Sequence, residues 1–84
     1  IENSPNSIFS KDSKYYLSLI YISQKKYQES IKILENLSSD HHRISKINHY
    51  LGLNYLRKGN KEQAKIFFDK SGYLYSKVIL KNLL

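Results

Sequence analysis

The sequence predicts an all-α fold in which antiparallel helix-turn-helix repeats stack side by side and a terminal helix follows them. Three observations predict it. Apolar residues recur at helical spacing, glycine or polar turns separate the apolar segments, and one apolar segment recurs further along the chain at a fixed interval. A chain of 84 residues can form one domain with one modest core.

The first helix is expected to run from about residue 11 to Ser23, after an N-terminal loop segment over residues 1–10. Ser10 or Asp12 could cap its first turn. Its apolar segment YYLSLIYIS also alternates as a strand does, but both faces of such a strand would be apolar, and the chain has no other strand-like run to pair with it. We therefore expect a helix with neighbours on several sides.

The next two helices follow polar turns. An amphipathic helix is expected to begin near Tyr27, with charges on the side opposite its apolar stripe. After it, Ser39 or Asp40 is placed to cap a third helix that runs to about Arg57.

Glycines mark the last two boundaries. Gly59 is expected to end the third helix, because a left-handed residue commonly closes a helix, and Asn60 can cap the fourth. Gly72 would cost a helix interior about 1 kcal/mol relative to alanine. We therefore expect a break there and a separate last helix from about Tyr75 to Leu84.

The interval of the repeat is 34 residues, which places Tyr16 over Tyr50 without a gap. Small residues also recur: Ser18 and Ser30 stand at equal distances from the first expected turn, as Gly52 and Ala64 do from the second. Residues equidistant from the turn of a helical hairpin come level with each other, so we expect these pairs to let the helices approach closely.

This pattern resembles the tetratricopeptide repeat over residues 11–78. The resemblance implies a short right-handed superhelix, an αα solenoid, with one unit over 11–44, a second over 45–78, and residues 79–84 in a C-terminal capping helix that starts near 75. Lys25 stands where the family's turn glycine is expected in the first unit. The second unit fits best, with Leu51, Gly52, Tyr55, Gly59, Asn60, Ala64 and Phe68, while the first fits with Leu17, Ser18, Tyr21, Tyr27, Ser30 and Leu34.

The resemblance also implies a function, that of a non-catalytic protein–protein interaction module within a larger protein. The partner segment would bind in a concave groove lined by tyrosine and leucine residues of the first helix of each unit. The alternative for these residues is that they fill the core. The expected groove residues are Tyr15, Tyr16, Leu19, Ile22, His49, Tyr50, Leu53 and Arg57.

The net charge of +7 raises an alternative function, a basic helical-repeat surface that binds nucleic acid. The lysines and arginines are spread along the chain, however, whereas nucleic-acid binders cluster them on one face. Solvated helix faces are therefore the preferred explanation. A further alternative is self-association through the apolar residues Val78 to Leu84.

Composition and spacing predict no enzyme, cofactor or metal site. The chain has no cysteine. His42 and His49 would lie about 10 Å apart on a helix, too far for one zinc ion with ligands at about 2 Å. Ser39, Asp40 and His41 are adjacent on a turn, where a catalytic triad rarely forms. The longest apolar run is too short to span a membrane, and nothing resembles a targeting segment, so we expect a soluble domain.

Overall fold

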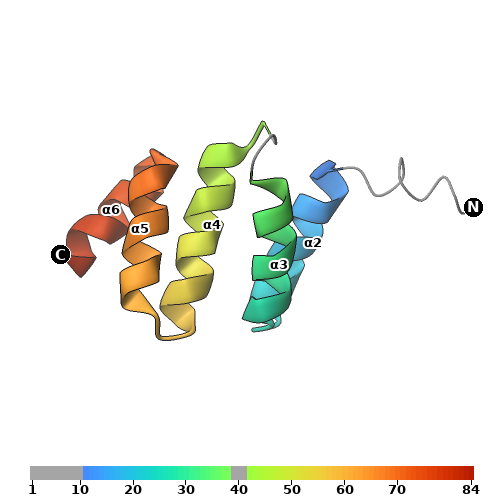
Figure 1. Ribbon diagram of the computed structural model, residues 1–84, viewed down its shortest axis with the longest axis horizontal. Helices are drawn as coiled ribbons and strands as arrows, with labels where there is room; N and C mark the ends of the chain where they lie inside the picture. The colour runs from blue at the N-terminus through green and yellow to red at the C-terminus, as the bar shows by residue number, and fades with distance from the viewer. Residues whose placement is uncertain (1–10, 39–41) are drawn as a thin grey trace, which may run out of the picture.

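The computed structural model describes residues 11–38 and 42–84, and the chain is helical over most of these ranges, without a strand. Figure 1 shows the helices standing side by side in chain order, from α2 at one end of the molecule to α6 at the other. Each helix packs against its neighbour in the chain, and α4 also contacts α2 and α6. The helices are α2 (Lys11–Ser23), α3 (Tyr27–Leu37), α4 (Ile44–Arg57), α5 (Lys61–Ser71) and α6 (Leu74–Leu83).

The predicted all-α fold of packed neighbouring helices is confirmed. The segment that also read as a strand lies wholly within α2. The side-chain oxygen of Asn60 accepts a hydrogen bond from the Gln63 N–H at 3.2 Å, as expected of a helix cap. Gly72 is left-handed, with φ of 68°, and separates α5 from α6.

The predicted start of the third helix is wrong. Its N-cap residue is Arg43, whose side chain makes no capping hydrogen bond. Ser39 and Asp40, which were expected to cap this helix, lie outside the described residues, as does Ser10. Arg43 instead turns its guanidinium toward Asp12 of α2, so this side chain ties two helices together rather than closing one.

The 34-residue interval is visible in the backbone of the two tight turns. The N–H of Lys26 donates to the Tyr21 carbonyl at 2.8 Å, and the N–H of Asn60 donates to the Tyr55 carbonyl at the same distance. A six-to-one hydrogen bond of this kind closes a helix when a left-handed residue stands inside it. That residue is Gly59 in the second turn, with φ of 92°, and Lys25 in the first, with φ of 64°.

The core lies between the paired helices. Ser18, Ser30 and Ala64 are fully buried, as is most of the apolar stripe of α3. The expected pairing of Gly52 with Ala64 stays a prediction, and the nearest atoms to a β-carbon placed on Gly52 belong to the ring of Phe68. Helical side chains point toward the N-terminus of their helix, so the Phe68 ring lies over the turn that contains Ala64.

The contact between the two hairpins is partly polar. The side-chain amide of Asn54 in α4 donates to the Ser30 hydroxyl in α3 at 2.9 Å. Both residues are fully buried, and the other amide atom of Asn54, Oδ1, has no hydrogen-bond partner. The α3–α4 contact therefore includes a buried hydrogen bond, and the Tyr55 hydroxyl of α4 also donates to the Glu35 carboxylate of α3 at 3.2 Å on the exposed side.

Candidate functional site

An aromatic row crosses the three helices α2, α4 and α6. Each ring in it lies 5.1–6.2 Å from the next, measured between ring centroids, and every contact is edge-to-face. This is the spacing and orientation in which aromatic pairs attract one another. In order along the row, the rings are Tyr16, Tyr15, Tyr50, His49, Tyr73 and Tyr75.

Two cations lie over the ends of the aromatic row. The guanidinium carbon of Arg43 lies 5.1 Å from the Tyr15 ring centroid and 5.2 Å from that of Tyr16, and Arg43 also donates to the Tyr16 hydroxyl at 3.0 Å. The ammonium of Lys46 lies 6.0 Å from the Tyr73 ring centroid. All three distances are within the range of cation–π attraction. The row therefore combines apolar rings with positive charge.

Burial acts on the phenol groups of the row. It raises the pKa of Tyr15 to about 12, with the neighbouring Tyr50 phenol adding to the shift and Arg43 opposing it. Burial also raises the pKa of Tyr50, and the Tyr73 phenol contributes. Higher pKa values keep these phenols protonated at neutral pH. The hydroxyl of the half-buried Tyr50 can therefore donate a hydrogen bond.

A hydrogen-bonded chain fixes the histidine of the row. Ser71 donates to the Ser45 carbonyl and Ser76 donates to Ser71, each at 2.8 Å. His49 Nδ1 lies 2.7 Å from the Ser76 hydroxyl oxygen. A carbonyl oxygen can only accept, so Ser71 uses its proton toward Ser45 and Ser76 uses its proton toward Ser71. The Ser76 hydroxyl oxygen must then accept from His49, and the hydrogen in that contact belongs to Nδ1. We therefore assign the proton of neutral His49 to Nδ1. Burial lowers the pKa of His49, which favours this neutral form.

The eight predicted groove residues fall into three groups. Tyr15, Ile22 and His49 are buried, so the expectation that they line an open groove is corrected: their side chains pack in the interior. The exposed members are Tyr16 and Arg57. The half-buried members are Leu19, Tyr50 and Leu53.

Two rings of the row and both of its cations were not among the predicted site residues. Tyr73 and Tyr75 come directly before and inside α6, and Arg43 and Lys46 lie at the start of α4. The tyrosines of the segment after Gly72 were the available signal, because Tyr73 precedes a serine by three positions, as Tyr15 does in α2. The contact of α6 with α4 is what brings them to the row.

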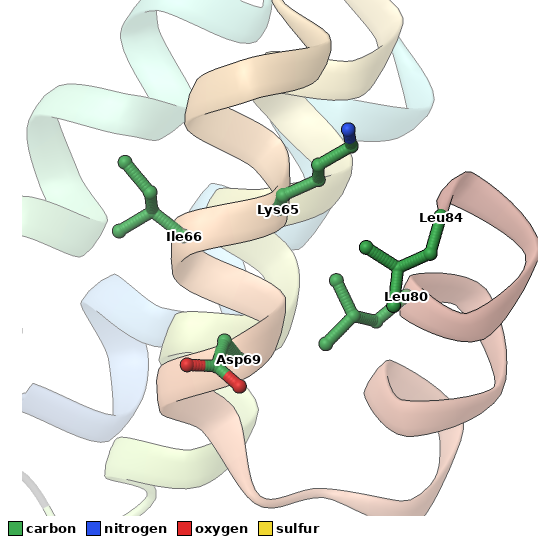
Figure 2. Close-up of a pocket in the computed structure, with 5 residues that line it drawn as sticks. All are labelled: Lys65, Ile66, Asp69, Leu80 and Leu84. Carbon is green, nitrogen blue, oxygen red and sulfur yellow. The ribbon is translucent and has the colours of Figure 1, made fainter.

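A shallow groove lies elsewhere, between α5 and α6, with a volume of about 300 Å³. Figure 2 shows Leu80 and Leu84 directed from the α6 side toward Lys65 of α5. None of its residues belongs to the aromatic row. The lining residues are Lys65, Ile66, Asp69, Leu80 and Leu84.

The described residues offer neither a metal cluster nor a membrane-spanning helix. Residues 11–38 and 42–84 contain no group of three or more histidine, aspartate or glutamate side chains placed to hold a metal ion. Asp40 and His41, named above in the candidate triad, lie outside these ranges. Within the same ranges, no helix is both long enough and apolar enough to cross a membrane.

Comparison with protein families gives a match for the first hairpin, which consists of α2 and α3. The family model of the tetratricopeptide repeat matches residues 12–41, which include nearly all of α2 and the whole of α3. The first hairpin, α2 and α3, is therefore similar to a tetratricopeptide repeat. Tetratricopeptide repeats generally mediate protein–protein interaction. The second hairpin, α4 and α5, has a turn with the same hydrogen bond 34 residues later in the chain. Searches of curated proteins and of solved structures found no significant match.

Proposed function

We propose that the chain is a non-catalytic protein-interaction module and that a segment of a partner protein binds along the aromatic row. The observation that carries this proposal is the continuity of the row across α2, α4 and α6. Rings held by three packed helices lose little freedom when a partner docks, so less binding energy is lost to ordering them. Tyrosine combines a large apolar surface with a polar tip and is a frequent anchor in interfaces.

The chemistry of the row defines the partner segment. The rings favour apolar or aromatic side chains, and the hydroxyls of Tyr50 and Tyr73 favour hydrogen-bond acceptors. Arg43 and Lys46 add positive charge over the row. A segment with apolar residues next to acidic ones satisfies all three features. Tyr16, Tyr50, Tyr73 and Tyr75 are the members with accessible surface.

The test uses variants that keep the rings. Tyr50 packs against the core, so Tyr50→Ala would disturb folding together with binding. Tyr50→Phe and Tyr73→Phe remove only the hydroxyls. Tyr27→Phe is the matched control, because Tyr27 is a partly buried tyrosine of α3 outside the row.

Peptides would be selected from a random display library against the wild-type chain, and their affinities for the variants measured by calorimetry. We expect Tyr50→Phe and Tyr73→Phe to weaken binding about fivefold each, the effect of one lost hydrogen bond of about 1 kcal/mol, and Tyr27→Phe to leave it unchanged. The proposal fails if no peptide binds, or if the selected peptides bind all three variants as tightly as the wild type.

A further inference from the structure

The two tight turns lie at the same end of the helix array. Figure 1 shows the α2–α3 turn and the α4–α5 turn along one edge of the molecule, and Lys58 of the second turn donates to the Gln28 side chain of α3 at 2.6 Å. The partners of this contact are 30 positions apart in the chain. The fold therefore brings together lysines and arginines that look scattered in the sequence. The cations at this edge, here called the turn end, are all exposed: Lys25, Lys26, Arg57, Lys58 and Lys61.

The turn end has more positive charge than the carboxylates around it offset. Within residues 11–38 and 42–84, none of its five cations forms an ion pair. The acidic residues in the first turns of α3 and α5 are Glu29 and Glu62, and Glu62 lies 3.6 Å from Lys65 instead. At the other end of α4, by contrast, Arg43 is paired with Asp12. An excess of unpaired cations on one exposed edge is the kind of surface that attracts a polyanion.

Tyrosine rings border the turn end. Tyr21 lies in the last turn of α2, and Tyr55, 34 positions later, lies in the last turn of α4. The ammonium of Lys26 is 6.0 Å from the Tyr21 ring centroid, and that of Lys58 is 5.9 Å from the Tyr55 ring centroid. Tyr27 begins α3 directly after the first turn. All three tyrosines are partly exposed, so each turn presents a ring beside a cation.

We propose that the turn end binds single-stranded nucleic acid. The phosphates lie against the five cations, whose attraction for a polyanion does not depend on base sequence. The tyrosines favour a nucleic acid over an acidic peptide or an anionic membrane, because unpaired bases stack on aromatic rings and the other two ligands have no bases. The same rings favour a single strand over a duplex, in which the bases are stacked on one another. The turn end shares no residue with the aromatic row, so the two proposals are independent.

The number of cations sets the salt dependence of binding. For single strands, the logarithm of the binding constant falls with the logarithm of the salt concentration, with a slope of about −0.7 for each phosphate neutralised. Five contacts therefore give a slope of about −3.5, and the affinity should fall about a hundredfold between about 50 mM and 200 mM salt. Because the cations lie on two turns, neutralising either turn should remove part of this slope.

Three double variants, each with two exposed lysines changed to glutamine, test the role of the turn end. One neutralises lysines of the first turn, one neutralises lysines of the second, and the control removes the same charge from α6. Glutamine keeps a polar side chain of similar length, and circular dichroism would verify that each variant is helical. The substitutions are, in that order, Lys25→Gln with Lys26→Gln, Lys58→Gln with Lys61→Gln, and Lys77→Gln with Lys81→Gln.

Affinity would be measured by fluorescence anisotropy with a labelled oligouridine strand of about 15 nucleotides, over a series of salt concentrations. Each turn-end variant should bind at least about tenfold more weakly at low salt, with a slope shallower by about 1.4, because two phosphate contacts are lost. The α6 variant should keep the affinity and the slope of the wild type. A duplex of the same length, a polyglutamate peptide and vesicles that contain phosphatidylserine should each bind more weakly than the single strand.

Three results would overturn the proposal. The first is a wild-type chain that does not bind oligouridine even at low salt. The second is an α6 variant that loses as much affinity as the turn-end variants, which would assign binding to net charge rather than to the turn end. The third is a duplex, polyglutamate peptide or vesicle that binds at least as tightly as the single strand.

Discussion

Gly52 lies directly against the ring of Phe68: a β-carbon on Gly52 would be 2.6 Å from Cδ1 and Cε1 of that ring. The first repeat has Ser18 and Leu34 at the same two positions, both fully buried. Ser18 of α2 is larger than its counterpart Gly52 of α4. Leu34 of α3 is smaller than its counterpart Phe68 of α5. Both repeats therefore place the small residue on the first helix and the large one on the second, and the difference in size is greater in the second repeat.

The first prediction concerns this pair. Gly52→Ala would gain about 1 kcal/mol of helix propensity, but the fully buried Phe68 ring must move, and overpacking typically costs about 1–3 kcal/mol. We expect a net loss of stability of about 1 kcal/mol in urea unfolding. Phe68→Leu should remove the clash, so the double variant should be more stable than the sum of the single changes predicts. Additive effects would show that the ring is free to move aside.

The second prediction concerns the first turn. Lys25 is left-handed, with φ of 64°, at the position that Gly59 occupies in the second turn. A side chain in this conformation costs about 1–2 kcal/mol, which glycine avoids. We expect Lys25→Gly to stabilise the chain by about 1 kcal/mol and to raise the Tm by about 4–8 °C. Lys25→Ala is the control, because it removes the charge and keeps the β-carbon. A similar gain in the alanine variant would assign the effect to charge.

The third prediction concerns pH. Burial lowers the pKa of His49 below the ordinary value of 6.5, so the unfolded chain binds a proton more readily than the folded chain does. The contribution of this group to stability is complete above pH 6.5 and is lost as the pH falls toward the folded-state pKa. Unfolding free energies measured between about pH 5 and 8 should therefore decrease toward the acid side.

The variants for this measurement are His49→Gln and His42→Gln. His42 is exposed and lies 3.8 Å from Asp12, so it serves as the control. We expect the pH dependence to weaken in His49→Gln and to persist in His42→Gln. The comparison uses the slope with pH rather than the stability itself, because His49→Gln removes ring packing with Tyr50 and Tyr73 in addition to the titration. An unchanged slope in the first variant would contradict the assignment.

The helices and turns could be predicted from the sequence because local signals agreed there. Asn60 is a cap, Gly59 and Gly72 are left-handed, and the strand alternative for α2 lacked a partner. The start of α4 was predicted wrongly because the local capping signal was misleading there. Asp40 has better capping chemistry than Arg43, but Arg43 makes its contacts with α2, at a residue 31 positions away in the chain.

The candidate site was predicted only in part. Four of its rings, Tyr15, Tyr16, His49 and Tyr50, were named from their positions in the repeat. Their burial depends on the neighbouring helices, which spacing alone does not specify: Tyr15 and His49 are interior, while Tyr16 is open. The contribution of Tyr73 and Tyr75 was missed because it depends on the packing of α6 against α4, which residue spacing does not specify.

The order of the helices in space is the order of the helices along the chain, and the main contacts of each are with its immediate neighbours. Little entropy is therefore spent on bringing distant segments together, and chains of this kind fold within microseconds to milliseconds. During synthesis, the α2–α3 hairpin can form before α4 exists. Each later helix then adds to a surface that is already in place.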